Sequence, residues 1–259
     1  MVTHLRKIRD FKVKNPIMIE GLPGIGNVGK IAVDFMIDNL KAKKIYEVHS
    51  YHFPNAVFIN EKNLVELPMV EVYHTKVNNG DILLLAGDIQ PIDEASCYEF
   101  CDKILEMFKK LNGKEIITLG GIGLQKVPLS PKVYCTANTK SIINEYESAN
   151  LQQDIYGVVG PIIGVTGLLV GLSGQAGIPA IALLAETLGH PSYLGIKGAR
   201  EILKILNKKL QLKLNLKELD DEIVEIEKEI SSKTKQLEFM QQKRRSKTAG
   251  SSTEMDYIG

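Results

Sequence analysis

The chain lacks the two features by which composition signals a nucleic-acid-binding protein. Its 259 residues include no Trp, nine Tyr and seven Phe, and the formal net charge is only +1. Single-stranded nucleic acids are held in basic grooves by aromatic side chains that stack on the bases, and anionic membrane surfaces also attract strongly basic proteins. The composition therefore predicts neither nucleic acid nor an anionic membrane as a partner.

Cysteine is also scarce. Cys97, Cys101 and Cys135 are an odd set, and the sequence shows no secretory signal. We therefore expect reduced thiols in a cytoplasmic protein rather than a disulfide framework. Cys97 and Cys101 could share one face of a helix, but there is no C-x-x-C pair of the kind that builds a zinc site. The expectation is buried thiols, no metal site and no cofactor.

Charge is missing from one long segment. No Asp, Glu, Lys or Arg occurs between Asp154 and Glu186, which is long enough to cross a bilayer. The same segment contains seven Gly and two Pro, and the breaks at Pro161, Gly177 and Pro179 divide it into strand, short helix and strand. These lengths suit the buried core of a parallel sheet, so we expect no membrane span.

Short apolar runs alternate with amphipathic ones through most of the chain. Runs that are apolar on both faces and separated by helices specify a mostly parallel sheet covered on both sides. The predicted fold is an α/β three-layer αβα sandwich over residues 1–211, with antiparallel strands from residues 57–74 at an edge. The predicted strands are 16–20, 44–49, 57–60, 69–74, 82–86 and 115–119, and the predicted helices are 30–40, 92–111, 141–148 and 193–210.

The character of the sequence changes after residue 211. Apolar residues then follow alternating steps of three and four, with Lys233 as the exception and with Glu and Lys at the flanking positions. This spacing predicts a coiled-coil helix over residues 212–245 that joins copies of the chain, followed by a polar, basic tail over residues 246–259. The predicted self-association positions are Leu216, Leu219, Ile223, Ile226, Ile230, Leu237 and Met240.

A glycine-rich loop follows the first predicted strand. It reads Gly21-Leu-Pro-Gly-Ile-Gly-Asn-Val-Gly-Lys30 and is compatible with two phosphate-binding motifs. Gly24, Gly26 and Gly29 have the G-x-G-x-x-G spacing of a dinucleotide site, and Gly24 to Lys30 has the G-x4-G-K spacing of a phosphate loop.

Neither motif is complete. Pro23 removes a backbone N–H donor from the turn, and Ile31 stands where a phosphate loop needs a hydroxyl to bind Mg²⁺. An enzyme or sensor for a nucleotide or nucleoside stays open as the alternative function. Its ligand loop would use Gly21, Gly24, Gly26 and Gly29, with Glu186 as the best acid candidate at the carboxyl edge of the sheet.

Three blocks of the sequence, taken together, resemble the PAC2 family of proteasome assembly chaperone 2-like proteins. The first is Gly21-Leu-Pro-Gly-Ile-Gly-Asn-Val-Gly29, and Gly120-Gly-Ile-Gly123 is similar to the middle block. The third is Gly164-Val-Thr-Gly-Leu-Leu-Val-Gly171, continued by Gly177-Ile-Pro-Ala and Leu183-Leu-Ala-Glu-Thr187. The resemblance covers roughly residues 10–230, and the order of the blocks makes it more specific than any one glycine motif.

The resemblance implies a nucleoside-phosphorylase-like αβα fold without an established enzymatic role. Archaeal members of the family resemble homo-oligomeric chaperones or activators of the 20S proteasome, so the implied partners are 20S α subunits, further copies of the chain and a possible small related chain. Many proteasome partners end in a hydrophobic–Tyr–any tripeptide that enters pockets between α subunits.

The last residues depart from that tripeptide. Tyr257 is third from the end and follows Asp256, and the chain ends with Ile258 and Gly259. One extra residue moves the terminal carboxylate by about 3.3–3.6 Å relative to the Tyr in an extended chain. Tyr257, Ile258 and Gly259 are therefore expected to form a docking tail with altered geometry.

Overall fold

The computed structural model describes residues 3–78, 80–91, 93–147, 151–157, 159–221 and 223–224. The chain divides into two units, Met1–Asn215 and Leu216–Gly259. In the second unit, residues 217–221 and 223–224 are helical, so the predicted positions Leu219 and Ile223 lie in helix. The predicted positions Ile226, Ile230, Leu237, Met240, Tyr257, Ile258 and Gly259 lie outside the described residues.

The first unit is built on a nine-stranded sheet of order β1-β3-β6-β7-β2-β8-β11-β9-β10. A separate two-stranded hairpin joins β4 and β5. The strands are β1 (Thr3–Lys7), β2 (Ile17–Gly21), β3 (Lys43–Ser50), β4 (Phe58–Ile59), β5 (Val65–Glu66), β6 (Val70–Val77), β7 (Gly80–Gly87), β8 (Glu115–Leu124), β9 (Val133–Ala137), β10 (Leu151–Gln152) and β11 (Ala180–Leu188).

The centre of the sheet is parallel. β2 pairs in parallel with β7 and β8, and β8 pairs in parallel with β11. The outer pairs β1–β3, β3–β6, β6–β7 and β9–β11 are antiparallel. Residues 81–87 of β7 are buried without interruption, which matches a strand that is covered on both faces.

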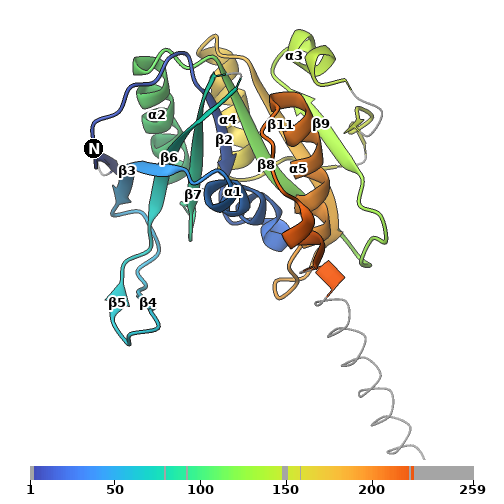
Figure 1. Ribbon diagram of the computed structural model, residues 1–259, viewed down its shortest axis with the longest axis horizontal. Helices are drawn as coiled ribbons and strands as arrows, with labels where there is room; N and C mark the ends of the chain where they lie inside the picture. Colours follow the sequence, from blue (N-terminus) through green and yellow to red (C-terminus); the bar gives the residue numbers. More distant parts are fainter. Residues whose placement is uncertain are drawn as a thin grey trace, which may run out of the picture. The chain divides into compact units, whose positions relative to one another are not determined.

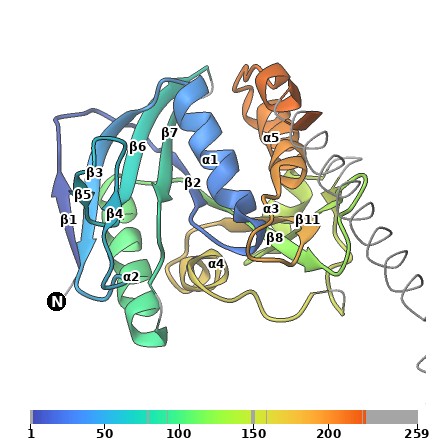
Figure 2. The same ribbon diagram turned by 90° about the horizontal axis from the view of Figure 1, so that it is seen from below.

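Helices form a layer on each side of this sheet (Figures 1 and 2). Helices α1 (Val28–Asn39) and α5 (Ile196–Leu210) lie on one face, and α2 (Glu94–Lys110) and α4 (Val165–Gln175) lie on the other. A short helix, α3 (Lys140–Glu145), lies beside β9. The predicted αβα class with a mostly parallel sheet is confirmed.

Local sequence explains where the longest helix begins and what it buries. The Asp93 side chain accepts a hydrogen bond of 2.9 Å from the Ser96 amide, which caps α2. Phe100, Cys101 and Phe108 of α2 are completely buried in the core. Cys97 and Cys135 are buried too, and all three cysteines are free thiols as expected.

Two predicted elements differ from the structure. The strand predicted over residues 115–119 instead continues through Gly120–Gly123 to Leu124, because its glycines let β8 lie close to neighbouring backbone, as Gly121 does beside Ile25. The strand expected at the start of the uncharged segment does not form among the described residues there. An isolated bridge between Tyr156 and Val159 takes its place, since glycine and proline break the run.

The uncharged segment forms α4 and β11, both within the first unit. The eleven residues of α4 are too few to span a bilayer. No helix in the described part of the chain is both long and apolar enough to cross a membrane.

Candidate functional site

The carboxyl ends of the central parallel strands meet at one edge of the sheet, which is where ligand sites of α/β proteins form. The glycine loop (residues 21–30) follows β2, Asp88 follows β7, and Glu186 and Thr187 lie near the end of β11. The register places Gly21 beside Ala86 and Glu186 beside Ile122. The topology therefore brings the predicted loop and the predicted acid to the same edge.

The loop glycines serve close backbone packing. A Cβ atom on Gly21 would lie 2.2 Å from the Gly29 carbonyl oxygen, and one on Gly29 would lie 2.3 Å from the Leu119 carbonyl oxygen. Strand β2, helix α1 and strand β8 thus touch through backbone alone. Gly26 has a φ of +62°, a conformation that favours glycine, whereas a side chain on Gly24 would meet nothing within 4 Å.

The cationic group of the loop is already paired. The Lys30 Nζ lies 3.0 Å from the Asp34 carboxylate and 3.3 Å from the Asp88 carboxylate. Asp34 lies further along α1, and Asp88 directly follows β7. A phosphate group at the loop would have to compete with both carboxylates for this lysine.

Glu20 is the most unusual group at this edge, and no motif pointed to it. Its side chain is completely buried, and burial raises its pKa to about 7. Its two carboxyl oxygens accept hydrogen bonds from the Leu22 amide at 2.9 Å and the Thr166 hydroxyl at 3.3 Å. Glu20 therefore joins β2 to the first turn of α4.

Gln90 makes a second link across the same edge. Its side-chain Nε2 donates to the Pro23 carbonyl at 2.7 Å, and its Oε1 accepts from the Val165 amide at 3.2 Å. An amide at the N-terminus of a helix is where an anion would otherwise bind. At the start of α4 this amide is already satisfied by the Gln90 side chain, whereas the Thr187 hydroxyl at the same edge is buried without a hydrogen-bond partner.

Glu186 has a structural role in this arrangement. Its carboxylate accepts hydrogen bonds from the Lys132 amide at 2.9 Å and the Tyr134 hydroxyl at 3.3 Å. It thereby anchors the beginning of β9 to β11. The structure gives Gly21, Gly26, Gly29 and Glu186 packing or anchoring contacts, and the ligand role predicted for them stays a prediction.

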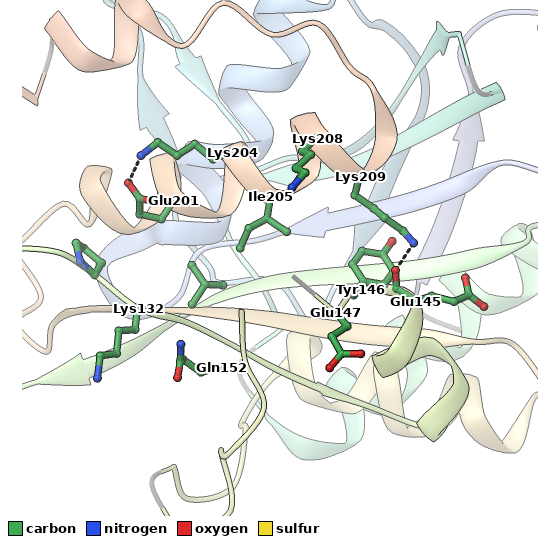
Figure 3. A pocket seen from close by; sticks show the side chains of 12 residues that line it. Lys132, Glu145, Tyr146, Glu147, Gln152, Glu201, Lys204, Ile205, Lys208 and Lys209 are labelled. Carbon is green, nitrogen blue, oxygen red and sulfur yellow. Dashed lines mark hydrogen bonds and ion pairs between the residues drawn. The ribbon is translucent and has the colours of Figure 1, made fainter. Parts of the chain in front are cut away.

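A cavity of about 770 Å³ lies away from the loop, between α5, the end of α3 and the start of β9. Figure 3 shows its charged lining. Glu201 pairs with Lys204 at 2.7 Å, and the Lys209 Nζ lies 4.6 Å from the centre of the Tyr146 ring. Because acids and bases alternate around the cavity, it does not select a ligand of one charge. The described residues contain no group of three or more His, Cys, Asp or Glu side chains able to hold a metal.

Large apolar side chains are exposed at the carboxyl edge. They lie in the segments that follow β2, β3, β8 and β11, and in the segment that precedes α4. They are Ile25, Tyr51, Val57, Phe58, Ile59, Leu64, Val65, Leu67, Val127, Leu129, Tyr156, Ile163 and Leu194. Exposed apolar side chains that form one contiguous patch mark surfaces for protein partners.

Together, the sandwich fold and the packed glycine loop define an αβα protein whose first loop is packed against its own backbone. A model of the PAC2 family matches residues 18–233, and the chain belongs to this family. The resemblance read from the three glycine-containing blocks is confirmed.

The chain is similar to three archaeal proteins over nearly its whole length. The chain has 32% identity to Pyrococcus furiosus PbaB, described as an archaeal proteasome activator, over 90% of this chain and 99% of that one, with a TM-score of 0.83. It has 25% identity to P. furiosus PbaA, described as an archaeal homolog of proteasome-assembly chaperone, over 98% and 100%, with a TM-score of 0.76. It is also 32% identical to the protein MJ0106 of Methanocaldococcus jannaschii, over 95% of this chain and 98% of that one.

Proposed function

We propose that this chain is a non-enzymatic, homo-oligomeric chaperone or activator that binds the α subunits of the 20S proteasome through its C-terminal tail. The observation that carries the proposal is the similarity to PbaB, which extends over 99% of that protein. The contacts at the glycine loop support a scaffold role, since Lys30 and the Val165 amide already have protein partners.

The proposed binding is multivalent. Copies joined through a helix that includes Leu219 and Ile223 would each contribute one tail. Linked tails of modest affinity can exceed the affinity of one tail by about 10²- to 10⁴-fold when they reach their sites together. A tail with an extra residue after its tyrosine could therefore still hold a ring of α subunits.

Deleting Tyr257, Ile258 and Gly259 is expected to abolish or sharply weaken binding to purified 20S proteasome, because the deletion removes the terminal group of every tail at once. The measurement is a pull-down followed by the native mass of the complex. The matched control deletes Ser251, Ser252 and Thr253, which shortens the tail equally and keeps its end. Equal binding by the two deletion variants would contradict the tail role.

The glycine loop gives a second test of the proposal. We expect no specific stabilisation by nucleotides or nucleosides, because Lys30 and the Val165 amide, two groups that could hold a phosphate, already have protein partners. Thermal unfolding with increasing ligand concentration measures this directly. A saturable rise in melting temperature that is lost in Lys30→Ala would favour the enzyme or sensor class instead.

A further inference from the structure

The outer side of strand β1 is an open edge of the main sheet. β1 is the first strand in the sheet order (Figure 2), and among the described residues it pairs only with β3. The Ile8 amide donates to the Ile45 carbonyl at 2.9 Å, and hydrogen-bonded pairs alternate along an antiparallel ladder. The backbone groups of Arg6 therefore face β3, whereas those of Leu5 and Lys7 face away from the sheet.

A contact at the start of this edge supports the assignment. The Thr3 amide has the same orientation as those of Leu5 and Lys7, and it donates to the Glu99 carboxylate of α2 at 3.0 Å. A side chain thus takes the place of a neighbouring strand at Thr3. Within the described part of the chain no such contact covers Leu5 or Lys7, so their amides and carbonyls are available to a further strand.

A cavity of about 350 Å³ lies between β1 and α2 beside this edge. Its lining includes the apolar parts of Leu5, Tyr46 and Met107. Side chains alternate between the two faces of a strand, so every second side chain of a strand added to β1 would point toward α2. The cavity has room for one apolar side chain of this set.

The charged part of the cavity lining has an excess of positive charge. Glu106 lies 2.8 Å from both Lys103 and Lys110, so one carboxylate is shared by two cations. Lys7, on the edge itself, pairs with Asp10. Basic side chains on an edge strand discourage unselective pairing. They leave a strand that carries acidic residues as the favoured partner.

We propose that β1 receives an extended segment of a partner protein as an additional strand of the sheet. The segment places an apolar residue in the cavity and an acidic residue two positions away, on the same face, beside Lys110. Recognition by strand addition takes its affinity from main-chain hydrogen bonds and its specificity from pockets for alternate side chains. This edge supplies both, through the outward groups of Leu5 and Lys7 and through the cavity against α2.

The probe for this site is the synthetic heptapeptide Thr-Glu-Thr-Leu-Thr-Glu-Thr with blocked ends. Titration into the full-length chain, followed by calorimetry, should show saturable binding with a dissociation constant below about 1 mM. The same peptide with both glutamates replaced by lysine should bind about 10-fold more weakly, because it meets the excess positive charge at Lys103 and Lys110. No saturable binding of the glutamate peptide would overturn the proposal.

Lys7→Pro and Lys7→Thr form a matched pair of variants for the main-chain contact. Both remove the ammonium group, but only proline removes the outward N–H, and proline is tolerated on an edge strand where that N–H faces solvent. Lys7→Pro should bind the glutamate peptide at least about 10-fold more weakly than Lys7→Thr, because a peptide carbonyl loses its donor. Equal binding by the two variants would contradict strand addition.

Lys110→Glu tests the charge at a side chain that is 72% exposed. This variant should prefer the lysine peptide to the glutamate peptide, which reverses the wild-type order. Lys109→Glu, at an exposed neighbouring position of α2 outside the cavity lining, is the control and should keep that order. An unchanged order in Lys110→Glu would also overturn the proposal.

Two further measurements separate this site from self-association and from the proposed function. A lower particle mass for Lys7→Pro than for Lys7→Thr would show that a second copy of the chain occupies the edge, which would overturn the proposal. Binding of Lys7→Pro to purified 20S proteasome should equal that of wild type, because the C-terminal tail is unchanged. That result would keep the proposed function whatever the peptide titrations show.

Discussion

Replacing Glu20 by Gln is expected to stabilise the protein strongly above pH 7 and hardly at all near pH 4.5. The folded-state pKa of Glu20 is raised from 4.5 to about 7 by burial. Below pH 4.5 the carboxyl is protonated in both folded and unfolded chains. As the pH rises from 4.5 to 7, the unfolded chain loses this proton first, so stability falls through that window and then levels off.

The size of the effect follows from the width of the window. A shift of this size is worth about 3 kcal/mol, at about 1.4 kcal/mol for each pKa unit. Glutamine does not titrate, and its amide can accept from the Leu22 amide and donate to the Thr166 hydroxyl. The difference in unfolding free energy between variant and wild type should therefore grow from near zero at pH 4.5 to about 3 kcal/mol at pH 8.

Urea unfolding at several pH values measures this difference. Glu61→Gln, at an exposed position of the hairpin turn, is the control and should show no comparable growth. A Glu20→Gln variant that is less stable than wild type at pH 8 would mean that the ionised carboxylate is well solvated by its donors. That result would contradict the burial argument.

Replacing Gly29 by Ala is expected to destabilise the fold by at least about 3 kcal/mol, at the upper end of the cost of overpacking. Alanine is normally the better residue in a helix, by about 1 kcal/mol. At position 29 its Cβ would lie 2.3 Å from the Leu119 carbonyl oxygen, which is backbone and cannot rotate away. Helix α1 would have to move off β8, and the glycine loop would move with it.

Gly171→Ala is the matched control because it also changes a helical glycine. A Cβ on Gly171 in α4 would meet nothing within 4 Å, so this variant should gain about 0.5–1 kcal/mol. Thermal or urea unfolding of the two variants should give shifts of opposite sign. A stabilised Gly29→Ala variant would show that the glycines of the loop are not there for packing.

The sequence predicted the parts of the fold that local pattern controls. An unbroken run of apolar residues predicted β7, and apolar residues at helical spacing predicted α2 and α5. These two patterns differ in the spacing of their apolar residues, which can be read from the sequence alone. Strands β1 and β9 were missed, since their pairing with β3 and β11 depends on distant residues. The continuation of β8 through Gly120–Gly123 was also missed, because glycine weakens a strand unless another backbone lies against it.

The candidate site was predictable in position and less so in chemistry. The glycine spacing located the loop, but it is equally compatible with phosphate binding and with close packing of backbone. The link from Glu20 to Thr166 joins residues 146 positions apart, so no local pattern contains it. The sequence signal for Glu20 was its position as an acid at the end of the otherwise apolar run of residues 16–20.

The central position of β2 sets the order in which the chain can fold. Residues 17–21 pair with β7 and β8, and β8 pairs with β11, which ends at Leu188. A ribosome adding about 5–20 residues per second takes roughly 6–25 s to reach Leu124, the last residue of β8. Until β7 and β8 have been made, β2 lacks the strands that flank it in the finished sheet, so its apolar residues stay unpaired while about half of the chain is synthesised.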